Sequence, residues 1–415
     1  MKQYYNALFI VVTVLSLVAA GCKKDKISVG PESITFPGVG GTQTLTVDSN
    51  TDWTPMPEAP WLTVSKMNAT NLRIEAAPNT TFSNRSAIVR CMAGSAAATI
   101  TVSQADLPAR QVDSLWLIDL YNATNGGSWK GKWLWSSPIT QWQGVTVINE
   151  RVARLSIPDN NLSGPLPESI ANLTALQYLD LSGNHFTGVV PAGINQLTQL
   201  WYLDLSENNL SGSFPAIPAL TQLLIFDISS NAFTALPALN MLTQLEYLAF
   251  CNNDISGSLP ANLSALTKLI YLDGSVNRFT GNIPAAWSSL TKMRVFYCYA
   301  NTLTGNIPDF LTNFTDLEAL ALHANNLTGS IPYDLGNLSQ LGELWLAQNQ
   351  LTGAIPAPLL ANPHWSEWKP NVCPQQSTYG FTGSDCSGSG APVAPKSTIA
   401  KQIKSKYKQS LTSVK

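Results

Sequence analysis

A leucine-rich pattern of apolar and polar positions repeats along residues 152–362 of the 415-residue chain. Each turn follows L-x-x-L-x-L-x-x-N-x-L-T-G-x-I-P, as in LQYLDLSGNHFTGVVP at residues 176–191. One asparagine per turn aligns nine copies at spacings of 22 to 24 residues: Asn160, Asn184, Asn208, Asn231, Asn253, Asn277, Asn301, Asn325 and Asn349. The leucines at positions 1, 4 and 6 must share one core, because no single turn can bury its apolar side chains alone. The pattern therefore predicts a solenoid of nine stacked turns.

The repeat resembles the plant-specific class of leucine-rich repeat, which implies a curved solenoid with a parallel sheet on its concave side. The asparagine at position 9 can bond backbone groups exposed at the bend, so the nine side chains are expected to form a ladder. Gly188 and Pro191 are examples of the residues that turn the chain away from each strand. The stretch TQWQGVTV at residues 140–147 resembles the N-terminal cap of the same class. Thr140 and Val147 replace its two usual cysteines, so this cap must depend on packing.

Two turns depart from the pattern. The turn at residues 223–244 is 22 residues long and reads TALP in place of T-G-x-I-P, so we expect its outer edge to be tightened. Gly274 stands at position 6, where a core leucine is expected. A glycine there predicts a local packing deficit unless a neighbouring side chain fills the space.

Residues 27–105 alternate apolar and polar positions in short runs such as TQTLTVDS and AATITVSQ, separated by Gly, Pro and Asn turns. This alternation predicts an all-β sandwich. The landmarks from GGTQTLTVDSNTDW to TITVSQ, which include Trp53, Trp61, Arg85 and Gln104, resemble the BACON domain of surface proteins from Bacteroidetes. The resemblance implies an immunoglobulin-like sandwich associated with carbohydrate, and a simple spacer is the alternative. Both tryptophans are interpreted as core residues rather than sugar platforms.

Residues 106–151 are interpreted as the N-terminal cap of the solenoid. One amphipathic helix is expected, with four apolar residues at helical spacing: Val112, Leu115, Trp116 and Leu120. Four tryptophans follow within fourteen residues: Trp129, Trp133, Trp135 and Trp142. A hydrophobic plug is favoured over a sugar-stacking shelf, because the first turn of a solenoid needs a cover for its core.

The N-terminus has the features of an export signal at residues 1–21. Lys2 precedes an apolar run that ends in LVAAGC. This ending resembles the bacterial lipobox, which implies cleavage before Cys22 and diacylation of its thiol, with residues 22–26 as a lipid-anchored linker. An ordinary signal peptide is the alternative. We therefore expect an exported lipoprotein of the bacterial outer membrane, on the cell surface or on the periplasmic face.

Export makes disulfides possible. Cys373 and Cys386 lie in a Gly- and Pro-rich segment after the last turn and are predicted to form a disulfide in a C-terminal cap at residues 363–390. Cys91, Cys251 and Cys298 are interpreted as small buried residues. The sequence has no Cys and His at metal-ligand spacing, so neither a metal nor another cofactor is expected.

Charge is distributed unevenly along the chain. Residues 27–395 carry 14 Lys and Arg against 25 Asp and Glu, a net charge of -11, so nucleic acid is not an expected partner. Residues 391–415 form a basic tail, and its last twenty residues hold six lysines and no acid. Four apolar residues recur in the tail at intervals of four: Ile399, Ile403, Tyr407 and Leu411. They allow an amphipathic helix on anionic lipid, and an unstructured tail is the alternative.

In a solenoid of this class, positions 3, 5, 7 and 8 of each turn face the concave surface. Positions 3 and 5 of the earlier turns form rows of tyrosine and aspartate, which are candidate ligand contacts: Tyr178, Asp180, Tyr202, Asp204, Asp227, Tyr247, Tyr271 and Asp273. These residues match the usual repeat, so they predict an open and unspecific contact surface.

A sharper candidate site lies from residue 293 onward, where the acids of position 5 disappear. Its residues surround a floor of small alanines: Tyr297, Tyr299, His323, Glu343 and Trp345. Because adjacent strands are about 4.8 Å apart, Tyr297 and Trp345 are expected roughly 10 Å from each other across Ala321. That gap could accept a ring or an apolar side chain.

These features favour a non-catalytic, monomeric receptor or adhesin that binds a protein or peptide on the concave face. Capture of a glycan by the BACON-like domain and the concave aromatics is the alternative. An enzyme is disfavoured, because no nucleophile elbow, P-loop or metal motif occurs in the sequence. The pair Asp180 and Asp204 is expected on an open face that would not shift the pKa of either carboxylate.

Overall fold

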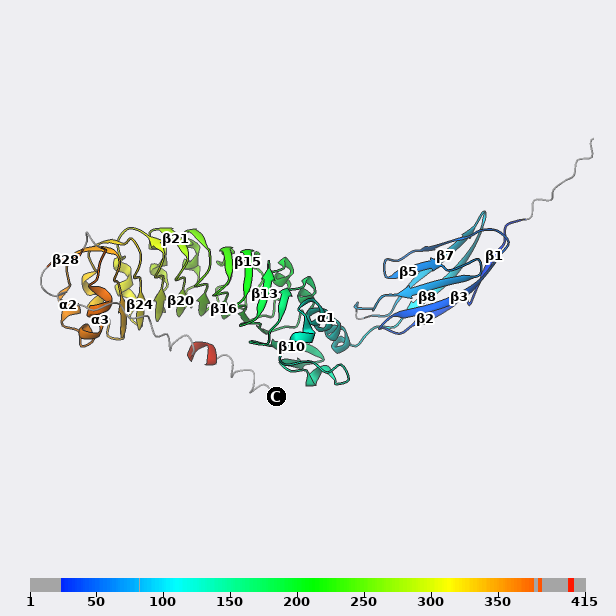
Figure 1. The fold of residues 1–415 in the computed structure, drawn as a ribbon, viewed down its shortest axis with the longest axis horizontal. Helices are drawn as coiled ribbons and strands as arrows, with labels where there is room; N and C mark the ends of the chain where they lie inside the picture. Colours follow the sequence, from blue (N-terminus) through cyan, green and yellow to red (C-terminus); the bar gives the residue numbers. More distant parts are fainter. Residues whose placement is uncertain (1–23, 82, 377–379, 383–401, 407–415) are drawn as a thin grey trace, which may run out of the picture. The chain divides into compact units, whose positions relative to one another are not determined.

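The computed structural model describes residues 24–81, 83–376, 380–382 and 402–406 (Figure 1). The chain divides into two compact units, with the boundary between Pro108 and Ala109. Across the described residues, no helix combines the length and hydropathy needed to cross a membrane. The expected export signal and Cys22 lie outside the described residues.

The first unit consists of eight strands in two four-stranded sheets. One sheet has the order β1 (Ile27–Gly30), β3 (Gly41–Ser49), β6 (Asn71–Ala76) and β5 (Leu62–Lys66). The other has the order β2 (Ser33–Phe36), β8 (Ala96–Gln104), β7 (Arg85–Ala93) and β4 (Thr54–Pro57). Alternate residues of the long strands are buried, so one face of each sheet contributes to a shared apolar core.

Both tryptophans of this unit contact its apolar core. Trp53 is 3% exposed, and its indole N–H donates to the carbonyl of Ala69 at 2.8 Å. Trp61 is half-buried, with the guanidinium of Arg85 4.4 Å from its ring centroid. The same guanidinium donates to the side-chain oxygen of Gln104. Trp53 therefore lies in the core of the unit, whereas Trp61 packs against that core and stays partly exposed.

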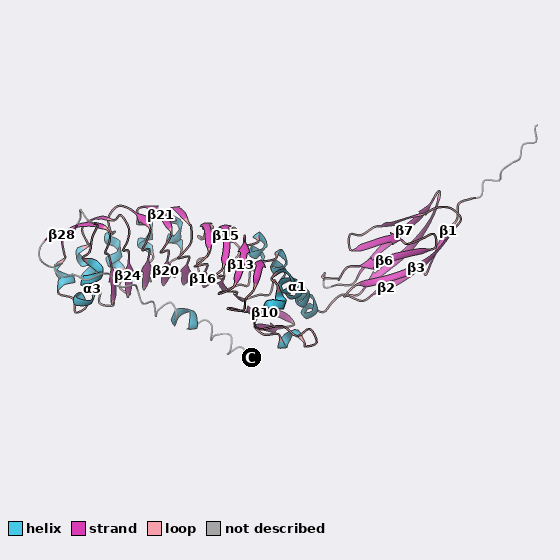
Figure 2. Ribbon diagram, in the orientation of Figure 1, coloured by secondary structure: helices cyan, strands magenta, loops and turns pink. Residues whose placement is uncertain are grey.

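The second unit is a solenoid whose main sheet has ten strands. Its first pair, β9 (Val145–Ile148) and β10 (Arg151–Ser156), is antiparallel. Every following neighbour is parallel, with one three-residue strand per turn: β12 (Tyr178–Asp180), β14 (Tyr202–Asp204), β16 (Ile225–Asp227), β18 (Tyr247–Ala249), β20 (Tyr271–Asp273), β22 (Val295–Tyr297), β24 (Ala319–Ala321) and β26 (Glu343–Trp345). Figure 2 shows these strands repeating along the solenoid. The expected solenoid with a long parallel sheet is confirmed.

Shorter strands and, in most turns, 3₁₀ helices complete the solenoid. The strands form three separate sheets: β11 (Ser163–Pro165), β13 (His185–Gly188), β15 (Asn209–Ser213) and β17 (Ala232–Ala235); β19 (Ser256–Ser258), β21 (Arg278–Gly281) and β23 (Thr302–Leu303); β25 (Thr328–Gly329), β27 (Gln350–Ala354) and β28 (Gly380–Thr382). The 3₁₀ helices are η3 (Glu168–Asn172), η4 (Ala192–Gln196), η5 (Ala261–Ala265), η6 (Ala285–Ser289), η7 (Asp309–Asn313) and η8 (Tyr333–Asn337). The first sheet ends at β17, in the short TALP turn, where the β15–β17 register also shifts. The shortened turn therefore interrupts the outer sheet.

Helices close both ends of the solenoid core. At the N-terminal end, α1 (Ala109–Ala123) buries Val112, Leu117 and Leu120, whereas the predicted Leu115 and Trp116 are only half-buried. It is followed by η1 (Gly126–Ser128) and η2 (Ile139–Gln141). At the other end lie α2 (Ala357–Leu360) and α3 (Trp365–Val372). One continuous apolar cluster runs from α1 to α3 through all nine turns.

Three of the four cap tryptophans belong to this apolar cluster. Trp129, Trp133 and Trp142 are at most 6% exposed, and the rings of Trp133 and Trp142 stack at 4.9 Å. Trp135 is 50% exposed and packs its edge against Tyr121. The plug is therefore built from three indoles, and the fourth makes a T-shaped contact with one of them, Trp142.

The cysteines divide into two groups. Cys373 is disulfide-bonded, and its predicted partner Cys386 lies outside the described residues. Cys91 and Cys298 are buried free thiols, as expected, and the free thiol of Cys251 is half-buried.

Candidate functional site

The concave sheet carries two rows of side chains in register. Position 3 contributes Arg154, Tyr178, Tyr202, Ile225, Tyr247, Tyr271, Val295, Ala319 and Glu343. Position 5 contributes Ser156, Asp180, Asp204, Asp227, Ala249, Asp273, Tyr297, Ala321 and Trp345. The apolar members of these rows form a cluster of their own, separate from the solenoid core. This cluster is the candidate binding surface, and we call it the concave cluster.

Tyrosine rings stack along the position-3 row. Tyr178 and Tyr202 lie 4.0 Å apart and nearly parallel, and Tyr247 and Tyr271 repeat the arrangement at 4.4 Å. Ile225 separates the two pairs. At the N-terminal end, the guanidinium of Arg154 lies 3.9 Å from the Tyr178 ring centroid. These contacts hold the rings in fixed orientations, and all four rings are at most 3% exposed in a cluster that also contains Ile403.

The position-5 aspartates are buried and held by hydrogen bonds. Asp204 is 1% exposed and Asp227 is 3% exposed. Backbone N–H groups two residues further on donate to them, from Ser206 at 3.1 Å and from Ser229 at 2.9 Å. The expectation of an open face is therefore wrong for these acids, because the tyrosines beside them and a charged partner shield them from water.

Tyrosine hydroxyls also donate hydrogen bonds to these two carboxylates. Tyr202 donates to Asp204 of its own strand at 3.2 Å. Tyr247 instead donates across to Asp227 of the preceding strand, also at 3.2 Å. Its own strand has Ala249 at position 5, so no carboxylate is available there. The strand of Asp227 has Ile225 at position 3, so the hydroxyl donor of this carboxylate comes from the neighbouring strand.

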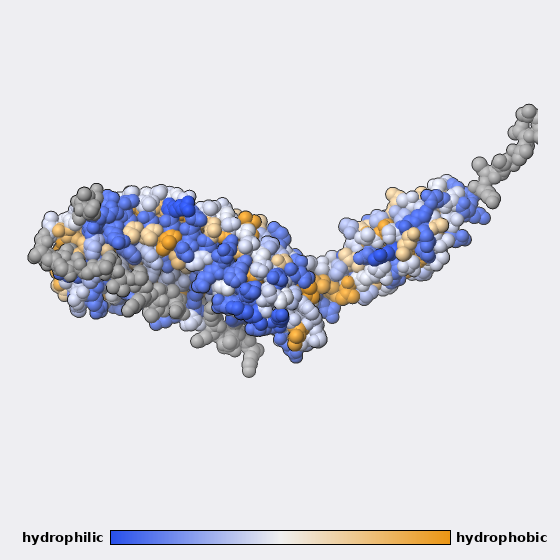
Figure 3. All heavy atoms as spheres, viewed as in Figure 1, coloured by the Kyte–Doolittle hydropathy of each residue, from blue (hydrophilic) through white to orange (hydrophobic). Residues whose placement is uncertain are grey.

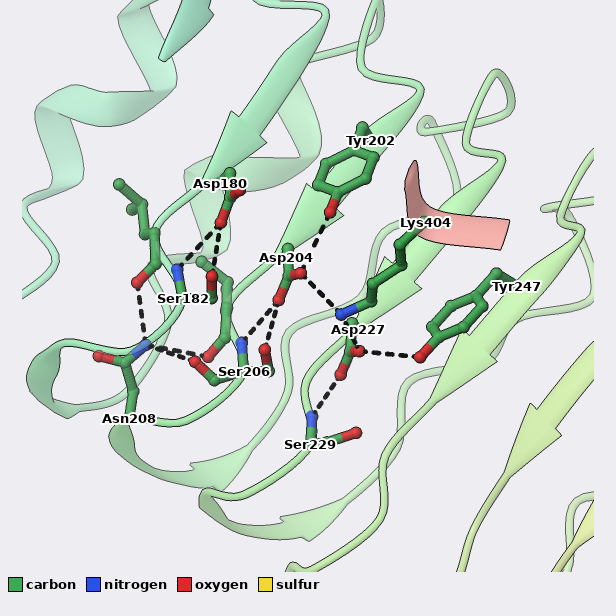
Figure 4. A network of polar contacts seen from close by, with 12 residues as sticks. Asp180, Ser182, Tyr202, Asp204, Ser206, Asn208, Asp227, Ser229, Tyr247 and Lys404 are labelled. Carbon is green, nitrogen blue, oxygen red and sulfur yellow. Dashed lines mark hydrogen bonds and ion pairs between the residues drawn. The ribbon is translucent and has the colours of Figure 1, made fainter. Parts of the chain in front are cut away.

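Lys404 is the charged partner of this acidic pair (Figure 4). It belongs to a short helical segment at residues 402–406, drawn in red in Figure 1. Its Nζ lies 2.8 Å from Oδ2 of Asp204 and also forms an ion pair with Asp227. Ile403 is 8% exposed and joins the concave cluster. For residues 402–406, the structure thus differs from both a lipid-bound helix and an unstructured tail.

The pKa values of Asp204 and Lys404 depend on burial and on their mutual contact. Burial alone would raise the pKa of Asp204, but the charge of Lys404 and hydrogen bonds from Lys404 and Ser206 outweigh it and lower the pKa. Burial would lower the pKa of Lys404, but the nearby carboxylates of Asp227 and Asp204 raise it. Asp273 contrasts with them, because burial raises the pKa of its carboxyl. Both members of the Asp204–Lys404 ion pair are therefore charged at neutral pH.

The downstream candidate site is assembled but largely filled by its own contacts. Tyr297 and Trp345 stand on either side of Ala321 in register, and they are 2% and 6% exposed. The Tyr297 hydroxyl donates to Oε2 of Glu343 at 3.0 Å. These contacts replace the expected open gap between two aromatic walls with a buried aromatic group.

His323 is the unusual member of this group. Its ring stacks on Tyr299 with centroids 4.5 Å apart. Its Nδ1 is buried, with no hydrogen-bond partner among the residues that the structure describes. Burial lowers the pKa of the imidazole to about 4. His323 is therefore neutral at physiological pH.

Two hollows of the second unit lie outside the concave cluster. One, of about 520 Å³, is lined by Trp135, Trp142 and residues of α1. The other, of about 620 Å³, lies beside half-buried Trp201 and is lined by amide side chains of successive turns: Gln177, Gln199, Gln222 and Gln244. The face of the second unit seen in Figure 3 is mainly hydrophilic. In the described part of the chain, no group of three or more His, Cys, Asp or Glu residues could hold a metal ion.

Sequence reasoning identified both rows but not their partner Lys404. The available signal was the contrast between an acidic body and six lysines in the last twenty residues. That contrast does not say which lysine meets which acid. The predicted lipid attachment at Cys22 lies outside the described residues.

Two family models match parts of the chain. A leucine-rich repeat model matches residues 150–210, and the BACON model, described as a putative N-terminal binding domain, matches residues 51–105. The chain thus contains both kinds of module. No curated protein sequence is significantly similar to it.

Several solved structures with the same solenoid fold are plant proteins. The ectodomain of the Arabidopsis thaliana receptor kinase GASSHO1/SCHENGEN3, in complex with Casparian strip integrity factor 2, is 31% identical with a TM-score of 0.52; the match covers 58% of this chain and 31% of that one. The ectodomain of the Arabidopsis receptor kinase HAESA, in complex with an IDA peptide hormone, is 27% identical with a TM-score of 0.51; the match covers 61% and 48%. A plant ice-binding protein is 24% identical with a TM-score of 0.54, and the match covers 61% of this chain and 84% of that one. At this identity the likeness shows a common fold and no more. The match thus spans a third to a half of the two receptor ectodomains.

Proposed function

We propose that this chain, a BACON domain followed by leucine-rich repeats, is a non-catalytic binding protein that recognises a protein or peptide on its concave face. The proposal rests mainly on the concave cluster, where stacked tyrosines and oriented carboxylates line one continuous parallel sheet. Aromatic side chains fixed in this way supply contact area at little cost in conformational entropy. The similar GASSHO1/SCHENGEN3 and HAESA ectodomains, the latter crystallised with a peptide hormone, support a peptide ligand.

The proposal includes attachment to the cell envelope. A lipid on Cys22 would hold a monomeric chain at the bacterial outer membrane, with the BACON domain, of immunoglobulin-like class, between lipid and solenoid. Support comes from the LVAAGC ending of the N-terminal apolar run. Radiolabelled palmitate should label the chain and not its Cys22→Ser variant. Protease shaving of intact cells would then distinguish the cell surface from the periplasmic face.

Peptide recognition is tested by selecting ligands from a displayed peptide library on the purified chain. We expect selected peptides to lose at least about tenfold in affinity for Trp345→Ala, because deleting that indole disrupts the buried aromatic group that supports the downstream end of the concave cluster. Trp135→Ala is the matched control, since Trp135 lies in the N-terminal cap and outside the main sheet. Equal affinities for both variants would contradict recognition on the concave face.

Glycan capture is the second candidate function, and one observation favours it. The groove beside Trp201 combines an indole with four amide groups from three successive turns, which suits stacking and hydrogen bonding to a sugar. A glycan array would reveal such binding. Sugar binding that disappears in Trp201→Ala, with no peptide selected from the library, would replace the peptide proposal.

A further inference from the structure

Asp204 and Asp227 bring two buried carboxylates together on adjacent strands of the concave sheet. Their strands pair in parallel, and the two residues are partners in register. Two charged carboxylates on adjacent strands repel each other, and burial strengthens that repulsion. A buried pair of this kind is stable only with a cation between its members or with a proton on one of them.

The Lys404 ammonium group supplies that cation. Its Nζ donates a hydrogen bond to Oδ2 of Asp204 and forms an ion pair with Oδ2 of Asp227. Lys404 and Asp204 are 200 positions apart in the chain. The Tyr247 ring contributes a further contact, with its centroid 5.4 Å from Nζ. An ammonium between two carboxylates and an aromatic face has the chemistry of a lysine-recognition site.

The surroundings of the carboxylates are already organised for a cation. Hydroxyls of Tyr202 and Tyr247 and the backbone amides of Ser206 and Ser229 donate to the two groups. All four donors belong to the solenoid, so their hydrogen bonds do not depend on the tail. The arrangement fixes the carboxylate directions before a lysine arrives, which reduces the entropic cost of binding.

Ile403 adds an apolar contact next to the lysine. It is 8% exposed and belongs to the concave cluster, which also contains Tyr202, Ile225 and Tyr247 from the turns around the two aspartates. The neighbouring Gln402 and Ser405 are exposed. The surface therefore accepts an apolar residue followed directly by a lysine, and the residues on either side of this pair are exposed to solvent.

We propose that Asp204 and Asp227 form a lysine-binding site for peptides in which an apolar residue precedes the lysine, and that Ile403 and Lys404 occupy it as an internal competing ligand. This inference rests on the proposed peptide-binding function and specifies its ligand class. An external peptide must displace the tail, so its apparent affinity falls in proportion to the fraction of molecules with the site open.

The first test measures binding of a fluorescent synthetic peptide of residues 396–415 to the full chain by anisotropy. Lys404→Glu repels the tail from the carboxylates and should bind the peptide at least about tenfold more tightly than the parent chain. Gln402→Glu is the matched control, because it introduces the same acid at an exposed neighbouring residue and should bind like the parent. Adding Asp204→Asn to Lys404→Glu should abolish the gain.

The outcomes of this test are decisive. Equal affinity of the parent and Lys404→Glu would overturn the internal ligand. A gain that survives Asp204→Asn would overturn the carboxylate site. In either case, library peptides that still depend on Trp345 would leave the proposed function standing, whereas loss of all peptide binding would remove both.

A second test identifies the occupant directly. Carbodiimide joins an amine to a carboxylate in direct contact, so mass spectrometry should find Lys404 linked to Asp204 or Asp227. Mixing unlabelled and ¹⁵N-labelled chains before coupling distinguishes the source of the lysine. Linked pairs of uniform label are expected, mixed pairs would assign the tail to a second copy, and no linked pair would overturn the contact.

Discussion

Gly274 shows how one residue that breaks the repeat is accommodated. It occupies position 6, where the adjacent turns have Phe250 and Cys298. A Cβ on Gly274 would lie 2.6 Å from Cε2 of Phe250 and 3.3 Å from Sγ of Cys298. The Phe250 ring therefore fills the space that a leucine at residue 274 would take, and the expected deficit is filled by a neighbour.

Restoring the usual leucine at residue 274 should therefore destabilise the protein. We expect Gly274→Leu to lower the free energy of unfolding by about 1–3 kcal/mol, because it overpacks the core against Phe250. Combining it with Phe250→Leu should recover part of the loss. Urea denaturation followed by circular dichroism measures both values, and additive losses in the double variant would contradict this packing.

His323 predicts a pH dependence at the same scale. Burial lowers the pKa of its imidazole from 6.5 to about 4, so the unfolded chain binds a proton more readily than the folded one. Its contribution to stability is present above pH 6.5 and is lost as the pH falls toward 4. His323→Asn should reduce the loss of thermal stability over this interval. His185→Asn, at an exposed residue, should not, and equal pH profiles for both variants would contradict the assignment.

At the scale of the element, the asparagine ladder defines each turn. The side-chain amide of Asn208 donates to the carbonyls of Leu181, Leu205 and Ser206, each at 3.1 Å. Its oxygen accepts from the backbone N–H of Phe186 at 3.0 Å. One side chain thus satisfies backbone groups of two adjacent turns.

Removing one rung should be costly. We expect Asn208→Ala to lower the free energy of unfolding by at least about 3 kcal/mol, because it leaves several buried backbone groups without partners. Asn313→Ala, at an exposed position of η7, should change it by less than about 0.5 kcal/mol. Guanidinium denaturation compares the two variants, and a small effect of Asn208→Ala would mean that water replaces the rung.

At the scale of the second unit, the solenoid depends on closure of its ends. Its apolar core is continuous from α1 to α3, so each open end would expose one full cross-section of that core. Trp133 lies in the N-terminal plug, between Trp129 and Trp142, and its indole N–H donates to the carbonyl of Gln143 at 2.9 Å. The plug therefore replaces the missing cysteine pair of the cap with aromatic packing.

Two tryptophans of the same cap provide a matched comparison. Trp133→Ala should destabilise the solenoid by about 3–5 kcal/mol, the usual cost of deleting a buried indole. Trp135→Ala should cost less than about 1 kcal/mol, because that ring is 50% exposed. Thermal unfolding by circular dichroism measures both, and equal losses would show that the four tryptophans form one cooperative unit.

The sequence by itself determined the repeating parts of this protein. The nine asparagines and the leucines between them predict the turns, the parallel sheet and the two concave rows, because each depends on residues that recur at a fixed spacing. The alternation of residues 27–105 likewise marks most of the strands of the first unit. These features are local or periodic, and the printed residues are sufficient to identify them.

Only the tertiary structure decided which side chains complete one another. The Phe250 ring over Gly274, the hydroxyl of Tyr247 on Asp227 and the lysine at residue 404 between two aspartates all join residues of different turns or of distant segments. No spacing rule connects Lys404 to Asp204, because their contact follows from the path of the whole chain. Whether the concave carboxylates were open to solvent or paired with a cation therefore depended on the three-dimensional arrangement.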